Sequence, residues 1–328
     1  MHHNLILRTT IKGASAWRGI ELRDNDTWIH RLTESEISSI NNALSFAKRK
    51  GLAFPHIRRE DFVLPELTGT LDLLSDELEN GLGFFLIRGL PIENYTDAEI
   101  NLIYYGIGLH LGTPVTQNPN GDLLGTVANT GDPENKQTRV YETNAYLPYH
   151  TDPSDVVALL CIRKAKTGGL SSLVSAASVY NTLLEKYPEL IGLFYRPMFY
   201  AHLGEDKVSP LFSYHEGKLS CRYLRQYIEL GHEINGVPLS RVEVEALDTF
   251  DSIVQDPDIR LDMMLEPGDI QFANNYAVMH SRTRFCDDKD PSLHRKLLRL
   301  WLKMPNARRL AADFPGRNGF GTPANQNH

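Results

Sequence analysis

The sequence predicts a mainly β protein with flanking helices, whose core is a jelly-roll barrel. Short apolar runs separated by turn residues fill the second half of the chain, as is typical of barrel strands. Amphipathic helix patterns lie mostly before and between these runs, so the helices are expected to pack on the barrel. The sequence has no repeat, low-complexity tract or Ser/Pro-rich linker, so residues 1–328 are expected to form a single domain.

Residues 1–115 are expected to supply helices and a strand that pack on this barrel. The run LTESEISSINNALSFAKRKG predicts a helix whose capping box is formed by Thr33 and Glu36. The run GFFLIRGL predicts a buried strand bounded by glycines. YTDAEINLIYYGIGLHLG predicts a second helix, with Thr96 and Glu99 as its capping box.

Residues 140–305 are expected to form the jelly-roll core. The predicted strands are residues 156–163, SSLVS, FYAHL, GKLSCRYL, IQFANN and RKLLRLWLK. Two helix patterns, SVYNTLLEKYPELIGLF and SRVEVEALDTFDSIVQ, interrupt this series. They fall within about 176–260, which we expect to be an insertion that forms a lid and sets substrate specificity.

Composition and charge exclude several classes of protein. The formal net charge of -7 gives no basic surface for nucleic acid. No run approaches the roughly 18 apolar residues of a membrane span. Cys161, Cys221 and Cys286 are too widely spaced for a disulfide framework, which favours a reducing cytoplasmic setting. We therefore expect a cytoplasmic protein that acts on a small molecule, and the sequence leaves its oligomeric state open.

The stretch AYLPYHTDPSD contains a pair of potential metal ligands. In an extended chain His150 and Asp152 project to the same side, whereas Asp155 points to the other face. The best third ligand is His280, in QFANNYAVMHSRTRF. Two histidines and one carboxylate leave three coordination positions open, as in non-haem Fe(II) oxygenases. Zinc hydrolases can use the same residue types, so the three residues alone do not identify the metal.

The strand HRKLLRLWLK places Arg295, Leu297, Arg299 and Trp301 on one face. Arginines among apolar residues on a barrel strand are costly unless they meet anions. A guanidinium group binds a carboxylate well because its planar fork can donate two parallel hydrogen bonds. A dicarboxylate that chelates iron at one end and reaches an arginine at the other, such as 2-oxoglutarate, fits this pattern.

These motifs resemble the 2-oxoglutarate-dependent dioxygenases of the taurine dioxygenase type. GFFLIRGLPIENYTDAEI, YHTD, TGGLSSLVSA and HRKLLRLWL follow the family's order along nearly the whole chain. The family's His-x-Asp…His…Arg pattern maps onto His150, Asp152, His280 and Arg295. The resemblance also implies that Ser171 or Ser172 assists the distal carboxylate of 2-oxoglutarate. Arg299 matches a second family arginine near the co-substrate or substrate.

The resemblance implies a double-stranded β-helix core that binds Fe(II), 2-oxoglutarate and O2. It further implies oxidation of a substrate C–H bond, most simply hydroxylation, with release of succinate and CO2. Arg295 follows His280 by fifteen residues, a longer gap than expected, so Arg295 and Arg299 both stay candidates for the main co-substrate anchor. The alternatives are a non-catalytic metal- and carboxylate-binding jelly-roll protein and a zinc-dependent hydrolase.

Polar residues near the two histidine motifs, and in SCRYLRQYIELG, are candidates for contact with the substrate. They are Asn144, Tyr146, Asn275, Tyr276, Arg222 and Arg225. A surface or packing role is an equal alternative for each of them. The sequence predicts neither the substrate nor the carbon that is oxidised.

Overall fold

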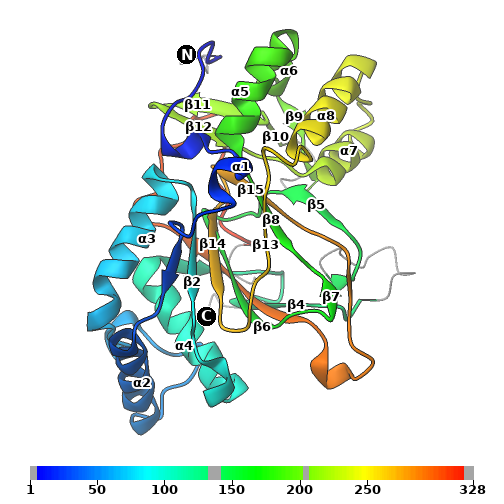
Figure 1. The fold of residues 1–328 in the computed structure, drawn as a ribbon. Helices are drawn as coiled ribbons and strands as arrows, with labels where there is room; N and C mark the ends of the chain where they lie inside the picture. Colours follow the sequence, from blue (N-terminus) through cyan, green and yellow to red (C-terminus); the bar gives the residue numbers. More distant parts are fainter. Residues whose placement is uncertain (1–5, 132–141, 202–206, 321–328) are drawn as a thin grey trace, which may run out of the picture.

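Two β-sheets face each other in the computed structural model, which describes residues 6–131, 142–201 and 207–320 (Figure 1). The major sheet has the order β1 (Ile29–Arg31), β2 (Phe84–Arg88), β14 (Ile270–Asn274), β6 (Val156–Arg163), β17 (Lys296–Lys303) and β3 (Thr113–Val115), and β4 (Leu124–Ala128) also pairs with β17. The minor sheet has the order β13 (Leu261–Met263), β8 (Ser171–Ser175), β15 (Val278–Arg282) and β5 (Leu147–His150). This pair of sheets is the jelly roll that the sequence predicts.

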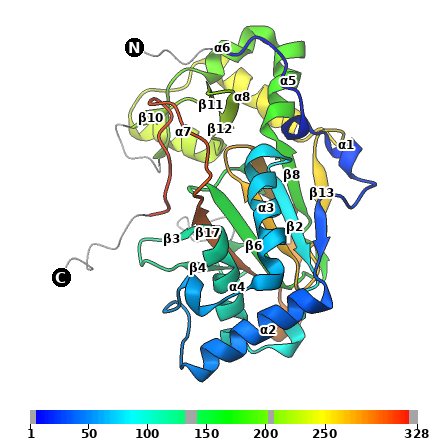
Figure 2. The ribbon, with the colours of Figure 1, turned by 90° about the vertical axis from the view of Figure 1, so that its left-hand side faces the viewer.

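Helices from the first third of the chain cover the outer face of the major sheet (Figures 1 and 2). They are α2 (Glu34–Arg49), α3 (Thr68–Asn80) and α4 (Asp97–Leu111), preceded by the short α1 (Gly19–Leu22). Along β17, Leu298, Leu300 and Leu302 pack on the helix side. Leu297 and Trp301 instead pack between the two sheets, so the alternation predicted for this strand is observed.

The segment between β8 and β13 forms a helical layer above the barrel (Figure 1). Its helices are α5 (Ala176–Lys186), α6 (Ile191–Phe194), α7 (Arg225–Ile234) and α8 (Arg241–Val254). Two hairpins accompany them, β9 (Met198–Phe199) with β10 (Val208–Ser209), and β11 (Phe212–His215) with β12 (Lys218–Cys221). A further small pair joins β7 (Thr167–Gly168) to β16 (Phe285–Cys286). The layer has its own apolar core, which includes Val179, Phe194 and Phe250.

Several element predictions need correction. The helix predicted over 178–194 is two helices, because Pro188 follows the last turn of α5 and cannot continue it. The strand predicted at FYAHL is present only as the short β9, and its last two residues lie outside the described part of the chain. The sequence did not reveal α3, α7 or β15 as separate elements.

Within the described residues, no helix is long and apolar enough to cross a membrane.

Candidate metal centre

His150, Asp152 and His280 are brought together at one end of the minor sheet. His150 ends β5 and pairs directly with His280 of β15 in the antiparallel register, and their rings lie 4.2 Å apart. The Asp152 carboxylate oxygens lie 3.9 Å from Nε2 of His150 and 3.6 Å from Nε2 of His280. One ligand atom from each residue lies within 4.8 Å of the others, so the three side chains form a possible metal site.

Asp152 is held by residues from other parts of the barrel. Its backbone N–H donates to Oδ1 of Asn275 at 2.9 Å. The indole N–H of Trp301 donates to its Oδ2 at 3.0 Å. Nη1 of Arg299 lies 4.0 Å from its Oδ1. Asn275, predicted as a substrate contact, therefore contacts the backbone of a candidate ligand.

The electrostatics of the site favour a cation. Burial alone would raise the pKa of Asp152, but Arg299 and the neighbouring histidines outweigh it and hold that pKa well below its usual range. Burial and then the adjacent His280 lower the pKa of His150 to about 3, so its imidazole is neutral at neutral pH. Nδ1 of His150 lies 2.8 Å from the carbonyl of Pro148. With the proton on Nδ1, Nε2 presents its lone pair, as a metal-binding histidine requires.

A cavity opens beside these three residues, between the two sheets. Its apolar walls are Val127, Leu147, Leu159, Leu265 and Leu297. Its polar lining consists of His150, Asp152, Ser171, His280, Ser281, Arg282, Arg295 and Arg299. Three buried arginines thus share one cavity with the possible metal site.

The guanidinium groups of Arg282 and Arg295 both lie close to the Phe285 ring, 4.7 and 5.1 Å from its centroid. Nη2 of Arg282 donates to the carbonyls of Thr143 and Ala145 at 2.8 and 2.6 Å. Among the described residues, Nε and Nη1 of Arg282 and Nη1 of Arg295 have no hydrogen-bond partner. Burial lowers the pKa of each guanidinium to about 10, and the charge of Arg295 adds to the shift of Arg282. The pair can therefore accept an anion.

Arg299 is placed differently from Arg295. Its Nε donates to Oε1 of Gln117 at 2.7 Å, and its guanidinium lies over the ring of Trp301 at 4.4 Å. Gln117 also donates to the backbone carbonyl of Arg299 at 3.0 Å. Arg299 thus lies at the Asp152 end of the cavity, whereas Arg295 lies at the Phe285 end.

Ser171 and Ser172 point to opposite sides of β8. Ser171 lines the cavity, pairs in register with Arg282 and donates to Oε1 of Gln271 at 2.9 Å. The Ser172 hydroxyl instead lies 2.5 Å from both the Tyr149 hydroxyl and a carboxylate oxygen of Asp262. Of the two serines, Ser171 alone lies in the cavity.

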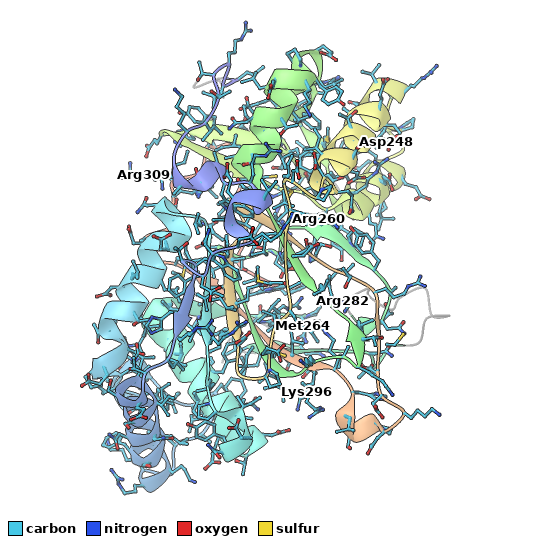
Figure 3. The ribbon with its side chains drawn as sticks, in the orientation of Figure 1. Asp248, Arg260, Met264, Arg282, Lys296 and Arg309 are labelled. Carbon is cyan, nitrogen blue, oxygen red and sulfur yellow. The ribbon has the colours of Figure 1, made fainter. Side chains whose placement is uncertain are left out.

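Arg225, predicted as a substrate contact, forms ion pairs with carboxylates of the helical layer. It begins α7, and its guanidinium lies 2.6 to 2.8 Å from carboxylate oxygens of Glu229, Asp248 and Asp251. Asp248 lies out on α8 in the helical layer (Figure 3). These three carboxylates account for the positive charge of Arg225 without a substrate.

The other candidates for substrate contact lie around residues 151–155, the loop between β5 and β6 that carries Asp152 and is called the metal loop below. Asn144 and Tyr146 are exposed ahead of β5, and the Tyr146 hydroxyl accepts a hydrogen bond from Gln255 at the end of α8. Tyr276 is buried with its hydroxyl 3.2 Å from Oδ1 of Asp155. The other oxygen of Asp155 accepts from the backbone N–H of Met304, so Asp155 does not face the histidines.

Sequence reasoning missed Arg282 and Gln117. Arg282 lies two residues after His280, and the alternation that selected Arg295 and Arg299 would also have placed it on the cavity face. Gln117 had no such signal, because it lies in a turn-rich stretch 182 residues away from its partner.

The chain is similar to known proteins in both sequence and fold. Residues 48–301 match the family described as taurine catabolism dioxygenase TauD, TfdA family. FR-33289 synthase of Streptomyces rubellomurinus is 36% identical over 92% of this chain and 93% of its own length. A taurine hydroxylase-like protein of Stachybotrys chartarum is 28% identical, over 91% of this chain and 81% of its own.

Solved structures share the fold at lower sequence identity. Asparagine oxygenase, in complex with Fe(II), 2S,3S-3-hydroxyasparagine and succinate, has a TM-score of 0.68 at 17% identity, over 84% of this chain and 93% of that one. The non-haem iron oxygenase OrfP, in complex with Fe and alpha-ketoglutaric acid, has a TM-score of 0.62 at 17% identity over the same shares. The matched residues and the 36% identical relative show that the chain belongs to the TauD/TfdA family of iron(II)- and 2-oxoglutarate-dependent dioxygenases.

Proposed function

We propose that His150, Asp152 and His280 hold Fe(II), and that Arg295 with Arg282 binds the distal carboxylate of 2-oxoglutarate. One observation carries this proposal: the donor set and two buried guanidinium groups with unused N–H donors line the same cavity. Two imidazoles and one carboxylate suit a divalent iron that keeps open positions. A carboxylate between two arginines would satisfy donors that are otherwise buried at a cost.

Fe(II) with 2-oxoglutarate and O2 supplies the oxidation: the co-substrate becomes succinate and CO2, and one oxygen atom enters a substrate C–H bond. The chain's residues position the reactants. Arg295, Arg282 and Ser171 would fix the distal end of the co-substrate, and the leucine and valine walls would exclude water. Arg299, held by Gln117, would stabilise the charge of Asp152.

The arrangement favours Arg295 over Arg299 as the main co-substrate anchor. Arg295 has an unused donor and lies beside a second arginine. Arg299 is already bonded to Gln117 and lies near a carboxylate of the protein itself. A dicarboxylate gains more from the end of the cavity where guanidinium donors are unused.

We further propose that the substrate is a small polar molecule, hydroxylated beneath the helical layer of residues 176–260. The names of relatives mention taurine and uridine-5'-phosphate, which are molecules of this kind. Cys161, Cys221 and Cys286 are all unpaired thiols, which supports a reducing, cytoplasmic setting.

The proposal is tested by comparing Asp152→Ala with Asp155→Asn. Asp155 is a nearby buried carboxylate that does not face the histidines. Asp152→Ala should lose bound Fe(II). Its substrate-independent succinate formation should fall by more than about 100-fold, because residues that only orient a metal ligand typically contribute about 10- to 100-fold. Asp155→Asn should keep both within about twofold, provided that its circular dichroism spectrum is unchanged. Equal succinate formation in Asp152→Ala and wild type would overturn the ligand assignment.

The same assay separates the alternatives. A zinc hydrolase or a non-catalytic binding protein would release no succinate from 2-oxoglutarate in any variant. Family membership disfavours both, and a zinc hydrolase would leave the paired arginines of the cavity without a role.

A further inference from the structure

Two more buried arginines, Arg222 and Arg317, lie together outside the cavity described above. Arg222 directly follows β12 in the helical layer, and Arg317 lies in the segment that follows β17. Both are more than nine-tenths buried, at 1% and 7% exposure. We propose that this pair binds an anionic group of the substrate, close to the metal site. This inference rests on the proposed function and adds the substrate's chemical class.

The two guanidinium groups have unused donors. Nη1 of Arg222 donates to the Ser209 hydroxyl at 2.6 Å, and its Nη2 donates to the carbonyl of Pro315. Nε of Arg222 and Nε of Arg317 are buried without a hydrogen-bond partner among the described residues. Across the same residues, the Arg317 side chain takes part in no ion pair with a carboxylate, and neither does that of Arg222.

Two cations buried together without an anion repel each other. Burial, and after it the neighbouring charge of Arg222, lower the pKa of Arg317 to about 9. Burial likewise lowers the pKa of Arg222. Such an arrangement is costly in the free protein, and the cost would be offset by a bound anion.

Other buried arginines of the described chain have an anion assigned to them. Arg308 lies 3.0 Å from a carboxylate oxygen of Glu79, and Arg299 lies beside Asp152. Arg282 and Arg295 face the proposed position of the co-substrate carboxylate. Among the described residues no carboxylate forms an ion pair with Arg222 or Arg317, so we infer that a bound ligand supplies their anion.

Backbone hydrogen bonds place both arginines beside the metal loop. The carbonyl of Tyr223, next to Arg222, accepts from the N–H of Thr151 at 2.8 Å. The N–H of Gly319, two residues after Arg317, donates to the carbonyl of Pro153 at 2.6 Å. Thr151 and Pro153 flank Asp152, whose charge raises the pKa of Arg317.

The segment of residues 312–320 thereby becomes one wall of the proposed substrate site. After β17 the chain runs up to the helical layer and then turns back toward the C-terminus (Figure 2). Phe314 lies under the Arg222 guanidinium at 4.4 Å, and the Phe320 ring stacks on Trp301. A substrate oxyanion between Arg222 and Arg317 would be anchored at one end, with the rest of the molecule free to extend toward the metal.

The ligand chemistry is that of an oxyanion: a carboxylate, a phosphate or phosphonate, or a sulfonate. A guanidinium fork matches any of these, and two forks favour a group with several equivalent oxygens. A neutral substrate would leave both charges unpaired. We therefore expect a substrate with a terminal oxyanion rather than a neutral or cationic one.

The test measures binding of inorganic phosphate, sulfate and acetate by anaerobic calorimetric titration. The protein is first loaded with Fe(II) and saturating 2-oxoglutarate, so that Arg282 and Arg295 are already occupied. Arg317→Gln and Arg222→Gln are compared with Arg309→Gln. Arg309 is an exposed arginine of the same C-terminal stretch and lies at the outer edge of the molecule (Figure 3), so this control removes the same charge.

We expect phosphate to bind the wild type, and to bind at least about tenfold more weakly in Arg317→Gln and Arg222→Gln. Arg309→Gln should bind as the wild type does. Equal binding in Arg317→Gln, or no binding of any of the three anions by the wild type, would overturn the proposal. The charge-transfer band of the Fe(II) and 2-oxoglutarate complex, recorded on each variant, shows separately whether the proposed function stands.

If Arg317→Gln loses that band, Arg317→Lys decides the question. Lysine keeps the charge and lacks the planar fork, so phosphate binding should weaken several-fold with the band intact. Unchanged phosphate affinity in Arg317→Lys would count against a direct contact with the anion.

Discussion

Asp152 contacts side chains from three distant positions of the chain. The Trp301 indole donates to its carboxylate, and the Asn275 side chain accepts from its backbone N–H. The Arg299 guanidinium lies beside the carboxylate. His150 and Asp152 could be predicted from the sequence, because residues two apart in an extended chain project to the same side. The contact from Asn275 to Asp152 spans 123 residues, and no local pattern encodes it.

Trp301→Phe tests whether the indole hydrogen bond to Asp152 orients the metal ligand. Phenylalanine keeps a ring against Arg299 and removes the N–H donor, so Fe(II) affinity should fall about 10- to 100-fold. Trp28→Phe is the control, because the Trp28 indole donates to the carbonyl of Leu22 in the same apolar cluster. Fe(II) affinity measured by competition with a chelator should be unchanged in Trp28→Phe. Equal affinities in the two variants would contradict an orienting role for Trp301.

Helix capping explains which helices could be predicted. Each of α2, α4 and α8 begins with a full capping box, at Thr33, Thr96 and Ser240. The two helices that sequence reasoning missed, α3 and α7, begin after leucines without a side-chain cap, and each contains a glycine. Without a start signal, and with a residue that weakens helix propensity, only tertiary packing reveals them.

Ser240→Ala should lower the free energy of unfolding by about 1 kcal/mol, because α8 loses the side chain that caps its N-terminus. Thr249→Ala, at a half-buried position of the same helix, is the control. Alanine has the higher helix propensity there, so stability should stay the same or rise slightly. Urea denaturation of both variants provides the measurement. A larger loss in Thr249→Ala than in Ser240→Ala would refute the capping argument.

Residues from both the N-terminal and the C-terminal parts of the chain pack against its central strands. Strand β1 and strand β2, from the N-terminal part, lie in the same sheet as β14 and β6. The C-terminal segment returns to the metal loop through Gly319 and Pro153. Residues 304–320 show no helix or strand period, so their place against the metal loop could not be predicted from the sequence.

Because one sheet contains strands from both ends of the chain, we expect residues 1–328 to unfold as a single domain. Tryptophan fluorescence, which reports on the barrel, and far-ultraviolet circular dichroism, which reports largely on the helices, should give coincident denaturation curves. The helical layer of residues 176–260 has a separate apolar core, so it is the part that could unfold independently of the barrel. Two transitions, with the helical signal lost first, would show that it is a second unit.

Anaerobic titration of the Fe(II)-loaded protein with 2-oxoglutarate tests the central claim most directly, because it needs no knowledge of the substrate. A visible metal-to-ligand charge-transfer band should grow to saturation in the wild type and be absent in His280→Ala. In Arg295→Ala the apparent affinity for 2-oxoglutarate should fall about 10- to 150-fold, as expected from losing a charge-assisted hydrogen bond. Arg225→Ala, which removes an arginine paired in the helical layer, should titrate as the wild type does. No band with the metal bound, or an unchanged affinity in Arg295→Ala, would contradict the proposed site.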